Sequence, residues 1–157
     1  MTDSTPPPDL RTRWLPTIGE AVNNQLLRGL PNGSPFGATS SGHADLRGLV
    51  IKAFVKSVSL RLIDFTSCEK EWAGQFGFCT VEDCLFVDSV LPTNFGSSFT
   101  LCRFSGAKLK GAVLRGQFEK CDFSKADLSS VLGNGVTFQN CDFTGTNMRK
   151  GQLTNSR

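Results

Sequence analysis

One stretch of the sequence reads Cys121-Asp122-Phe123-Ser124-Lys125-Ala126-Asp127-Leu128-Ser129-Ser130. A bulky apolar residue recurs here every five positions, and a small residue stands two positions before it. The same pattern occurs in Ala44-Asp45-Leu46-Arg47-Gly48 and in Ala107-Lys108-Leu109-Lys110-Gly111. A period of five fits neither an α-helix, which repeats at about 3.6 residues, nor a strand, which repeats at about 2. The chain must therefore turn once per repeat, so that stacked turns bury a core that no single repeat buries.

These segments resemble the pentapeptide-repeat family, in which a small residue, Asp or Asn, and a central Leu or Phe follow one another, over roughly residues 44–153. The resemblance implies an all-β solenoid, a right-handed quadrilateral parallel β-helix with four repeats per coil. It also implies that the central residue and the small residue two before it point inward. We assign residues 44–157 to this β-helix.

The spacing predicts a core rich in phenylalanine, because most of the 13 Phe fall on central positions. One wall is predicted to stack Phe76, Phe99, Phe118 and Phe138. Rings one coil apart lie about 4.8 Å from each other and fill the interior. The predicted core residues are Leu46, Phe65, Phe76, Phe86, Phe99, Phe104, Leu109, Leu114, Phe118, Phe123, Leu128, Phe138, Phe143 and Met148.

Residues 1–43 precede the repeats. Met1–Pro8 is polar and rich in proline, which is typical of a disordered tail. Apolar residues four apart between Pro16 and Pro31 predict a short amphipathic helix over about residues 16–30, followed by a Gly/Ser-rich connector. Because the open end of a β-helix exposes core side chains, we expect this helix to cap it; docking onto a partner is the alternative.

All six cysteines occupy the small-residue position of a repeat. Cys79, Cys102, Cys121 and Cys141 are predicted to line one wall as stacked thiols. Packing as small apolar residues is favoured over disulfides or a metal site, because the chain has no Cys-x-x-Cys spacing and one His. This usage of cysteine is typical of a reducing compartment.

The inventory of side chains disfavours an enzyme. The one histidine, His43, lies in the connector and is expected to be solvated, so no Ser-His or Cys-His pair stands on the rigid coils. No catalytic residue, cofactor or metal site is predicted. Aspartates that directly precede a centre are expected to accept hydrogen bonds from turn amides. They are Asp45, Asp64, Asp122, Asp127 and Asp142.

Charge is uneven along the chain, although the net charge is only +3. Residues 64–102 carry six acids and one Lys, whereas residues 103–157 carry nine Lys or Arg and four acids, which predicts an acidic middle and a basic C-terminal part. The widest gap in the repeat, Pro92–Ser98, is expected to project as a loop whose Phe95 either contacts a partner or folds back as a lid. The predicted partner-binding residues are Asp64, Glu69, Glu71, Glu82, Asp83, Asp88, Pro92, Asn94 and Phe95.

A rigid solenoid without reactive groups favours a non-enzymatic interaction module that binds one protein and inhibits or protects it, such as an immunity or self-resistance protein acting on a toxin. The family resemblance implies an alternative, a DNA mimic that modulates bacterial gyrase or topoisomerase IV and confers quinolone or toxin resistance. A strongly negative rod suits that role better than this slightly basic chain. Direct nucleic-acid binding is disfavoured because acids interleave with the basic residues, without exposed aromatic residues for stacking. A structural role without a specific partner stays open.

No apolar run approaches the roughly 20 residues that cross a bilayer, and Met1–Pro8 lacks the pattern of a signal peptide, so we expect a cytoplasmic location without membrane contact. After Leu153 only four residues follow, so the final coil is expected to be either exposed or covered by a second copy. The family resemblance implies a homodimer through the C-terminal coil.

Overall fold

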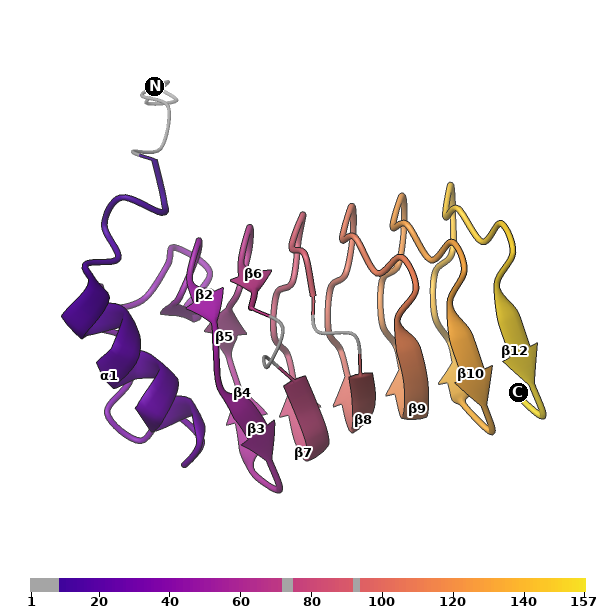
Figure 1. The fold of residues 1–157 in the computed structure, drawn as a ribbon, viewed down its shortest axis with the longest axis horizontal. Coiled ribbons are helices and arrows are strands. Elements are labelled where there is room, and N and C mark those ends of the chain that lie inside the picture. Colours follow the sequence, from indigo (N-terminus) through magenta and orange to yellow (C-terminus); the bar gives the residue numbers. More distant parts are fainter. Residues whose placement is uncertain (1–8, 72–74, 92–93) are drawn as a thin grey trace.

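The chain winds into a stack of coils whose strands pair in parallel (Figure 1). The structure is a computed structural model that describes residues 9–71, 75–91 and 94–157. The offset between paired residues of neighbouring coils runs from 18 residues, between Leu85 and Arg103, to 21, between Asp64 and Leu85. Four pentapeptides fit such a coil, which confirms the predicted four-sided solenoid. One column of paired residues crosses six successive coils: Asp45, Asp64, Leu85, Arg103, Asp122 and Asp142.

The described residues form one helix and twelve short strands. Their bounds are α1 (Pro16–Leu26), β1 (Ala44–Asp45), β2 (Val50–Ile51), β3 (Phe54–Lys56), β4 (Ser59–Arg61), β5 (Ile63–Asp64), β6 (Glu69–Lys70), β7 (Gln75–Glu82), β8 (Asn94–Thr100), β9 (Val113–Glu119), β10 (Leu132–Asn134), β11 (Thr137–Gln139) and β12 (Gln152–Thr154). The largest sheet has the order β12-β10-β9-β8-β7-β3, with β11 on β9 and β4 on β7. The pairs β1-β5 and β2-β6 form two smaller sheets.

Stacked phenylalanine rings fill the interior of the coils. One column runs through nearly parallel rings with centroids 4.8–5.2 Å apart, which is the spacing of neighbouring strands. A second column contains Phe99, Phe118 and Phe138, with centroids 5.0 and 5.3 Å apart. The members of the first column are Phe65, Phe86, Phe104, Phe123 and Phe143.

Most of the predicted core residues are buried. Phe138 and Phe143 are only partly buried but pack against the core. The prediction is wrong for Met148, whose side chain is 40% exposed because it lies in the last coil, where no described coil covers it. The fully buried members are Leu46, Phe65, Phe76, Phe86, Phe99, Phe104, Leu109, Leu114, Phe118, Phe123 and Leu128.

The loop predicted over Pro92–Ser98 is wrong for its described part. Residues from Asn94 onward belong to β8, and Phe95 is a core residue, 1% exposed, whose ring stacks on Phe76 with centroids 6.4 Å apart. The predicted wall that placed Phe76 with Phe99 is therefore wrong as well, since Phe76 pairs with Phe95 and Val81 pairs with Phe99. The physical reason is that the central residues Leu91, Phe95 and Phe99 are four residues apart instead of five. The coil is therefore shortened here and contains no insertion. Pro92 itself lies outside the described residues.

The six cysteines are free thiols, and all except Cys141 are buried. Their arrangement differs from the predicted wall in one member. The stacked thiols are those that stand two residues before a ring of the first phenylalanine column: Cys84, Cys102, Cys121 and Cys141. Cys79 lies outside this set, and its backbone N–H donates to Ser97 Oγ at 3.0 Å. Burial raises the pKa of the Cys84 thiol to about 12, so this group stays protonated at neutral pH.

We expect these thiols to be protected in the native protein. Because a thiolate is the reactive form and five of the six thiols are buried, a water-soluble disulfide reagent should modify only Cys141 under native conditions and all six cysteines in denaturant. Absorbance of the released thiol measures the stoichiometry. Rapid modification of several thiols in the native state would contradict the packing described above.

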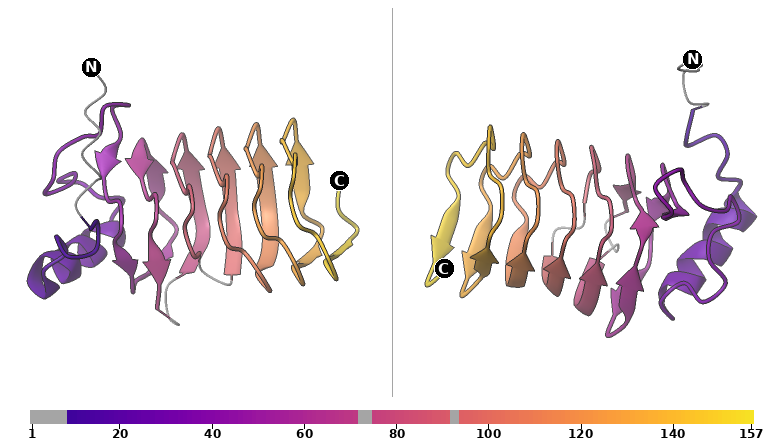
Figure 2. Two further views of the ribbon diagram at one scale, coloured as in Figure 1. Left: turned by 90° about the horizontal axis from the view of Figure 1, so that it is seen from above. Right: turned by 180° about the vertical axis from the view of Figure 1, so that it is seen from behind.

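Helix α1 covers the N-terminal end of the stack, as predicted for a cap, and the C terminus lies at the opposite end (Figure 2). Val22 and Leu26 are buried against the core. Asn23 substitutes for a neighbouring strand, because its amide donates to Val50 O at 3.0 Å and accepts from the N–H of Lys52 at 2.8 Å. The helix therefore satisfies both apolar and polar groups of the first coil.

The helix is shorter than the predicted range of 16–30. It begins at Pro16 and ends at Leu26, because Gly29 and Leu30 adopt left-handed conformations with φ of 78° and 60°. The N–H of Leu30 donates to Gln25 O at 3.0 Å and closes the turn. Termination thus occurs before Pro31 is reached.

Asp45 ties the segment before α1 to the first coil. Its carboxylate accepts hydrogen bonds from Arg13 Nη1 at 2.9 Å and from Arg47 Nε at 2.9 Å. The Arg13 guanidinium also lies 4.1 Å from the centroid of the Phe36 ring. Burial by itself raises the pKa of Asp45, but the hydrogen bonds from Arg13 and Arg47 outweigh it and hold that pKa well below its ordinary value.

We expect Asp45→Asn to lower the free energy of unfolding at pH 7 by about 2–3 kcal/mol, because two guanidinium groups lose their countercharge. The folded pKa of Asp45 lies below the unfolded value, so its contribution is present above about pH 4 and is lost as the pH falls towards the folded pKa. Urea unfolding from pH 7 to pH 2.5 should therefore show the two proteins converging at acid pH. Asp142→Asn is the control for a carboxylate without an arginine partner: the hydrogen bond from the Thr144 amide also lowers the pKa of exposed Asp142, but Asn keeps that bond, so its pH-dependent difference should be much smaller. A difference that stays constant with pH would contradict the assignment.

Candidate protein-interaction surface

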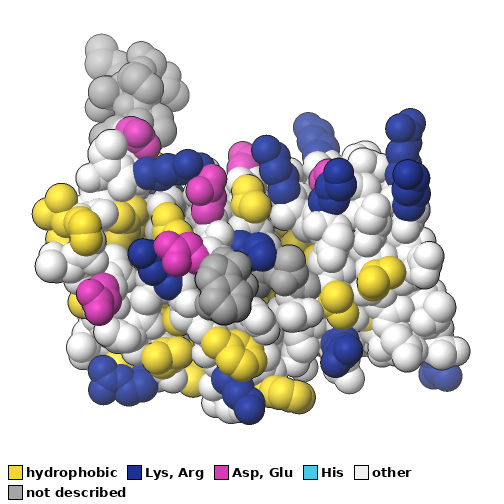
Figure 3. Space-filling view, in the orientation of Figure 1, with side chains coloured by type: hydrophobic (Ala, Val, Ile, Leu, Met, Phe, Trp, Pro, Cys, Tyr) yellow, Lys and Arg dark blue, Asp and Glu magenta, His cyan; other side chains and the backbone are white. Residues whose placement is uncertain are grey.

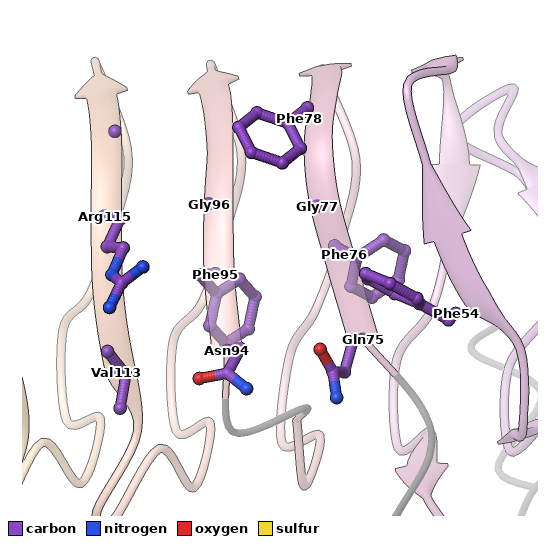
Figure 4. Close-up of a pocket in the computed structure, with 11 residues that line it drawn as sticks. Phe54, Gln75, Phe76, Gly77, Phe78, Asn94, Phe95, Gly96, Val113 and Arg115 are labelled. Atoms are coloured by element: carbon purple, nitrogen blue, oxygen red, sulfur yellow. The ribbon is translucent and has the colours of Figure 1, made fainter.

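The outward face of the largest sheet carries two exposed phenylalanines. Phe54 on β3 is 50% exposed and Phe78 on β7 is 76% exposed. Both line a groove of about 590 Å³ that crosses β7, β8 and β9 (Figure 4). Figure 3 shows hydrophobic side chains gathered over this part of the surface, with Lys and Arg side chains beside them. Large exposed aromatic rings in a hollow of the surface are typical of interaction sites.

The strand register arranges the outward side chains in rows that run across the strands. Pairing of Phe76 with Phe95 places Gln75 beside Asn94, and their amide groups lie at the same end of the groove (Figure 4). A second row contains Gly77 and Gly96, so the floor of the groove is bare backbone over two strands. A Cβ atom at Gly77 would lie 3.1 Å from Cε2 of Phe54, because that ring folds towards the glycine.

Phe78 stands at a corner of the coil in a left-handed backbone conformation. Its φ is 54°, a left-handed value that bulky residues rarely adopt, and the pairing of β7 with β8 shifts register between Gly77 and Thr80. This irregularity is a β-bulge, which re-aims a side chain. In the neighbouring coil the equivalent turn residue is Ser57, with φ of 56°. The same left-handed conformation recurs at other corners of the solenoid, such as Leu62 and Leu101, so what distinguishes Phe78 is its exposed ring.

Phe54 and Phe78 are not among the contact residues predicted from the sequence. A signal was present, because each is a bulky apolar residue off the central positions: Phe54 directly precedes the centre Val55, and Phe78 follows the centre Phe76 by two. Since only central and small positions point inward, a phenylalanine elsewhere in a repeat indicates an exposed ring.

The acidic middle predicted from the sequence is largely neutralised by residues from other parts of the fold. Asp64 is only 6% exposed and accepts a hydrogen bond from the Thr66 amide at 2.9 Å, so its assignment as a surface contact is wrong. The other acids are at the surface. Their partners are Arg11 for Glu69, Lys52 for Glu71 at 3.2 Å, Arg61 for Glu82 at 3.6 Å and His43 for Asp83 at 3.2 Å. Asp88 forms no ion pair with any described residue, and Asn94 is exposed in the groove.

The prediction that His43 is solvated is wrong. Its side chain is buried, with Nδ1 at 2.9 Å from Ser41 Oγ and Nε2 at 3.2 Å from Asp83 Oδ1. The reason is that His43 directly precedes β1 and lies in the same column of the stack as Asp83, two coils further along, so its ring reaches that carboxylate. This contact fixes the connector to the solenoid.

The aspartates that precede a centre accept hydrogen bonds from turn amides, as predicted. In each case Oδ1 lies 2.8–3.2 Å from the backbone N of the residue two positions later. The hydrogen bonds to Ser129 hold the pKa of Asp127 below its usual value. Among the described residues, His, Cys, Asp and Glu form no group arranged to hold a metal. The five aspartates are Asp45, Asp64, Asp122, Asp127 and Asp142.

None of the helices in the described part of the chain has the length and apolarity required to cross a membrane.

Comparison with known proteins finds a family match in the C-terminal part of the chain. Residues 117–149 match the family model of pentapeptide repeats, in 8 copies. No curated protein matches the chain. Among solved structures the chain is similar to HetL, a pentapeptide repeat protein involved in heterocyst differentiation regulation from the cyanobacterium Nostoc sp. strain PCC 7120, with 15% identity and a TM-score of 0.34. The match covers 71% of this chain and 65% of HetL. The family match shows pentapeptide repeats at residues 117–149, and the strand pairing continues the same stack of coils on both sides of that segment.

Proposed function

We propose that this protein is a non-enzymatic interaction module that binds one protein partner through the groove between Phe54 and Phe78. The observation that carries the proposal is the exposure of both rings on the same sheet, beside one groove. Exposed aromatic rings over a backbone floor offer a partner a large apolar contact at low entropic cost, because the solenoid is already ordered. The surface differs from the one expected from the sequence, which combined the acidic middle with a loop.

Affinity capture with wild type and with the double variant Phe54→Ser, Phe78→Ser tests this proposal. We expect one protein in stoichiometric amount with wild type and its loss with the double variant. Leu101→Ser is the matched control, because Leu101 is also an exposed apolar residue with a left-handed φ of 56°. Thermal unfolding checks that the variants remain folded. Equal capture by all three proteins would remove the groove from the interaction.

An inhibitory or protective action on the partner, as in immunity or self-resistance against a toxin, is the form of this function that we favour. Two observations support it besides the groove. The aspartates accept hydrogen bonds from turn amides, and most of the thiols are buried in the core, so these groups have structural roles. A cytoplasmic location is part of the proposal and is consistent with six free thiols. The captured protein, assayed with and without the solenoid, should lose activity or gain protection.

Modulation of gyrase or topoisomerase IV is the alternative. DNA mimicry requires a continuous negative wall, whereas Glu69, Glu71 and Glu82 each pair with a Lys or Arg side chain. Supercoiling by purified gyrase, with and without a quinolone, is therefore expected to be unaffected by the protein. A change in supercoiling would favour the alternative over the groove.

We also propose that the C-terminal coil forms a homodimer. Phe138 and Phe143 are partly buried there and Met148 is exposed, which leaves apolar surface at this end of the stack. Light scattering across a concentration series should show a dimer that Met148→Glu converts to a monomer. A monomeric mass at high concentration would contradict the dimer without affecting the groove.

A further inference from the structure

We propose that the groove between Phe54 and Phe78 binds an extended acidic segment of a partner protein. The segment would run across the strands and carry an apolar side chain midway between two acids that are four residues apart. This inference rests on the proposed function, because it uses the same groove and adds the chemistry of the partner.

The ends of the glycine floor are marked by two basic residues. Lys56 pairs with Gly77, Gly77 with Gly96, and Gly96 with Arg115, so the four residues form one row across β3, β7, β8 and β9. Three strand spacings separate Lys56 from Arg115, which corresponds to about 14 Å between their Cα atoms. Between the two cations the Phe54 ring lies beside Gly77, whereas a Cβ atom at Gly96 would meet nothing within 4 Å, so another chain can approach the backbone closely at Gly96.

Neither cation is neutralised within the described part of the chain. Lys56 and Arg115 take part in no ion pair there, and Lys56 Nζ lies 5.9 Å from the centroid of the Phe78 ring. The described residues that line the groove include Arg115 and no acidic residue. This contrasts with Lys52 and Arg61 nearby, which pair with Glu71 and Glu82. A negatively charged occupant therefore complements this site.

An extended peptide fits the dimensions of the row. Its residues advance by about 3.3 Å each and every second side chain faces the same way, so acids at positions 1 and 5 lie about 13 Å apart on the face that carries position 3. With the acids at Lys56 and Arg115, position 3 lies over the glycines, where Phe54 and Phe78 flank it. The amides of Gln75 and Asn94 are available to the peptide backbone along the edge of the row.

Fluorescence anisotropy with the labelled peptide Asp-Thr-Phe-Thr-Asp and the full chain tests the inference. We expect saturable binding to wild type and a loss of affinity of about tenfold for either Lys56→Glu or Arg115→Glu. Arg149→Glu is the control for net charge, because Arg149 is exposed and distant from the groove lining. The peptide Asp-Thr-Ser-Thr-Asp should bind about tenfold more weakly, since it lacks the ring over the glycines.

A charge swap makes the test specific. The peptides Lys-Thr-Phe-Thr-Asp and Asp-Thr-Phe-Thr-Lys each keep one acid, and one of them should bind Arg115→Glu more tightly than it binds wild type. Three outcomes would overturn the inference: no saturable binding to wild type, equal weakening by Arg149→Glu, or displacement of the peptide by single-stranded oligothymidylate at equal concentration. If any one of these outcomes occurs while the double variant Phe54→Ser, Phe78→Ser still abolishes capture of a protein, the proposed function stands. Only the inference that the partner segment is acidic is then wrong.

Discussion

Phe104→Ala is expected to lower the free energy of unfolding by about 3–5 kcal/mol, the largest effect of any single substitution considered for this chain. The Phe104 ring stacks on Phe86 at 5.0 Å and on Phe123 at 4.8 Å, and it meets Phe95, Phe99 and Phe118 edge to face. Its removal opens a cavity in the middle of the column. The backbone of neighbouring coils is fixed by hydrogen bonds on both sides, so the cavity collapses little.

Chemical denaturation monitored by circular dichroism measures this effect. Leu101→Ala serves as the control, because the side chain of Leu101 is 48% exposed and its truncation should change the free energy of unfolding by about 0.5 kcal/mol or less. Comparable losses for the two variants would mean that burial along the column is not what stabilises the solenoid. A loss near 1 kcal/mol for Phe104→Ala would indicate that the coils repack around the gap.

Gly116→Ala is expected to cost about 2–4 kcal/mol, the second largest effect. Gly116 has φ of 95°, and a Cβ atom there would lie 2.3 Å from the backbone oxygen of Ser97 in the neighbouring coil. That oxygen belongs to a paired strand and has little freedom to move. The methyl group therefore pushes two coils apart.

Gly135→Ala is the matched control for the cost of placing alanine in a left-handed backbone conformation. Gly135 has φ of 69°, but a Cβ atom there meets no other atom within 4 Å. Its substitution should cost about 1 kcal/mol, the penalty of a left-handed conformation alone. The difference between the two variants in urea unfolding isolates the clash. Equal losses would show that conformation rather than contact between coils sets the cost.

Residue spacing along the chain predicted the coil itself. The period of five, the small residue before each centre and the aspartate between them are local features, and each has its predicted role in the structure: Phe123 is buried, Cys121 is buried beside it, and Asp122 bonds the Ser124 amide at 2.8 Å. Such roles depend only on a residue's place within its own repeat. They can be inferred wherever the repeat is regular.

The error at Phe95 shows where this local reasoning stops. A step of four and an insertion look alike in the sequence between Leu91 and Phe99, and only the pairing of Phe95 with Phe76 and Leu114 distinguishes them. A change of one position exchanges core and surface, since neighbouring side chains along a strand point to opposite sides. The same shift misplaced Cys79 among the stacked thiols.

Contacts between coils were decided by the tertiary structure alone. The sequence by itself determined a solenoid with a phenylalanine core and an N-terminal helical cap, because those follow from periods within the chain, while its four sides were implied by the resemblance to pentapeptide repeats. It did not determine that Arg61 faces Glu82, that His43 reaches Asp83, or that Phe54 and Phe78 share a groove. Partners in neighbouring coils are separated by 18 to 21 residues, depending on the length of each coil, so their meeting is set by the register between coils and not by any period in the sequence.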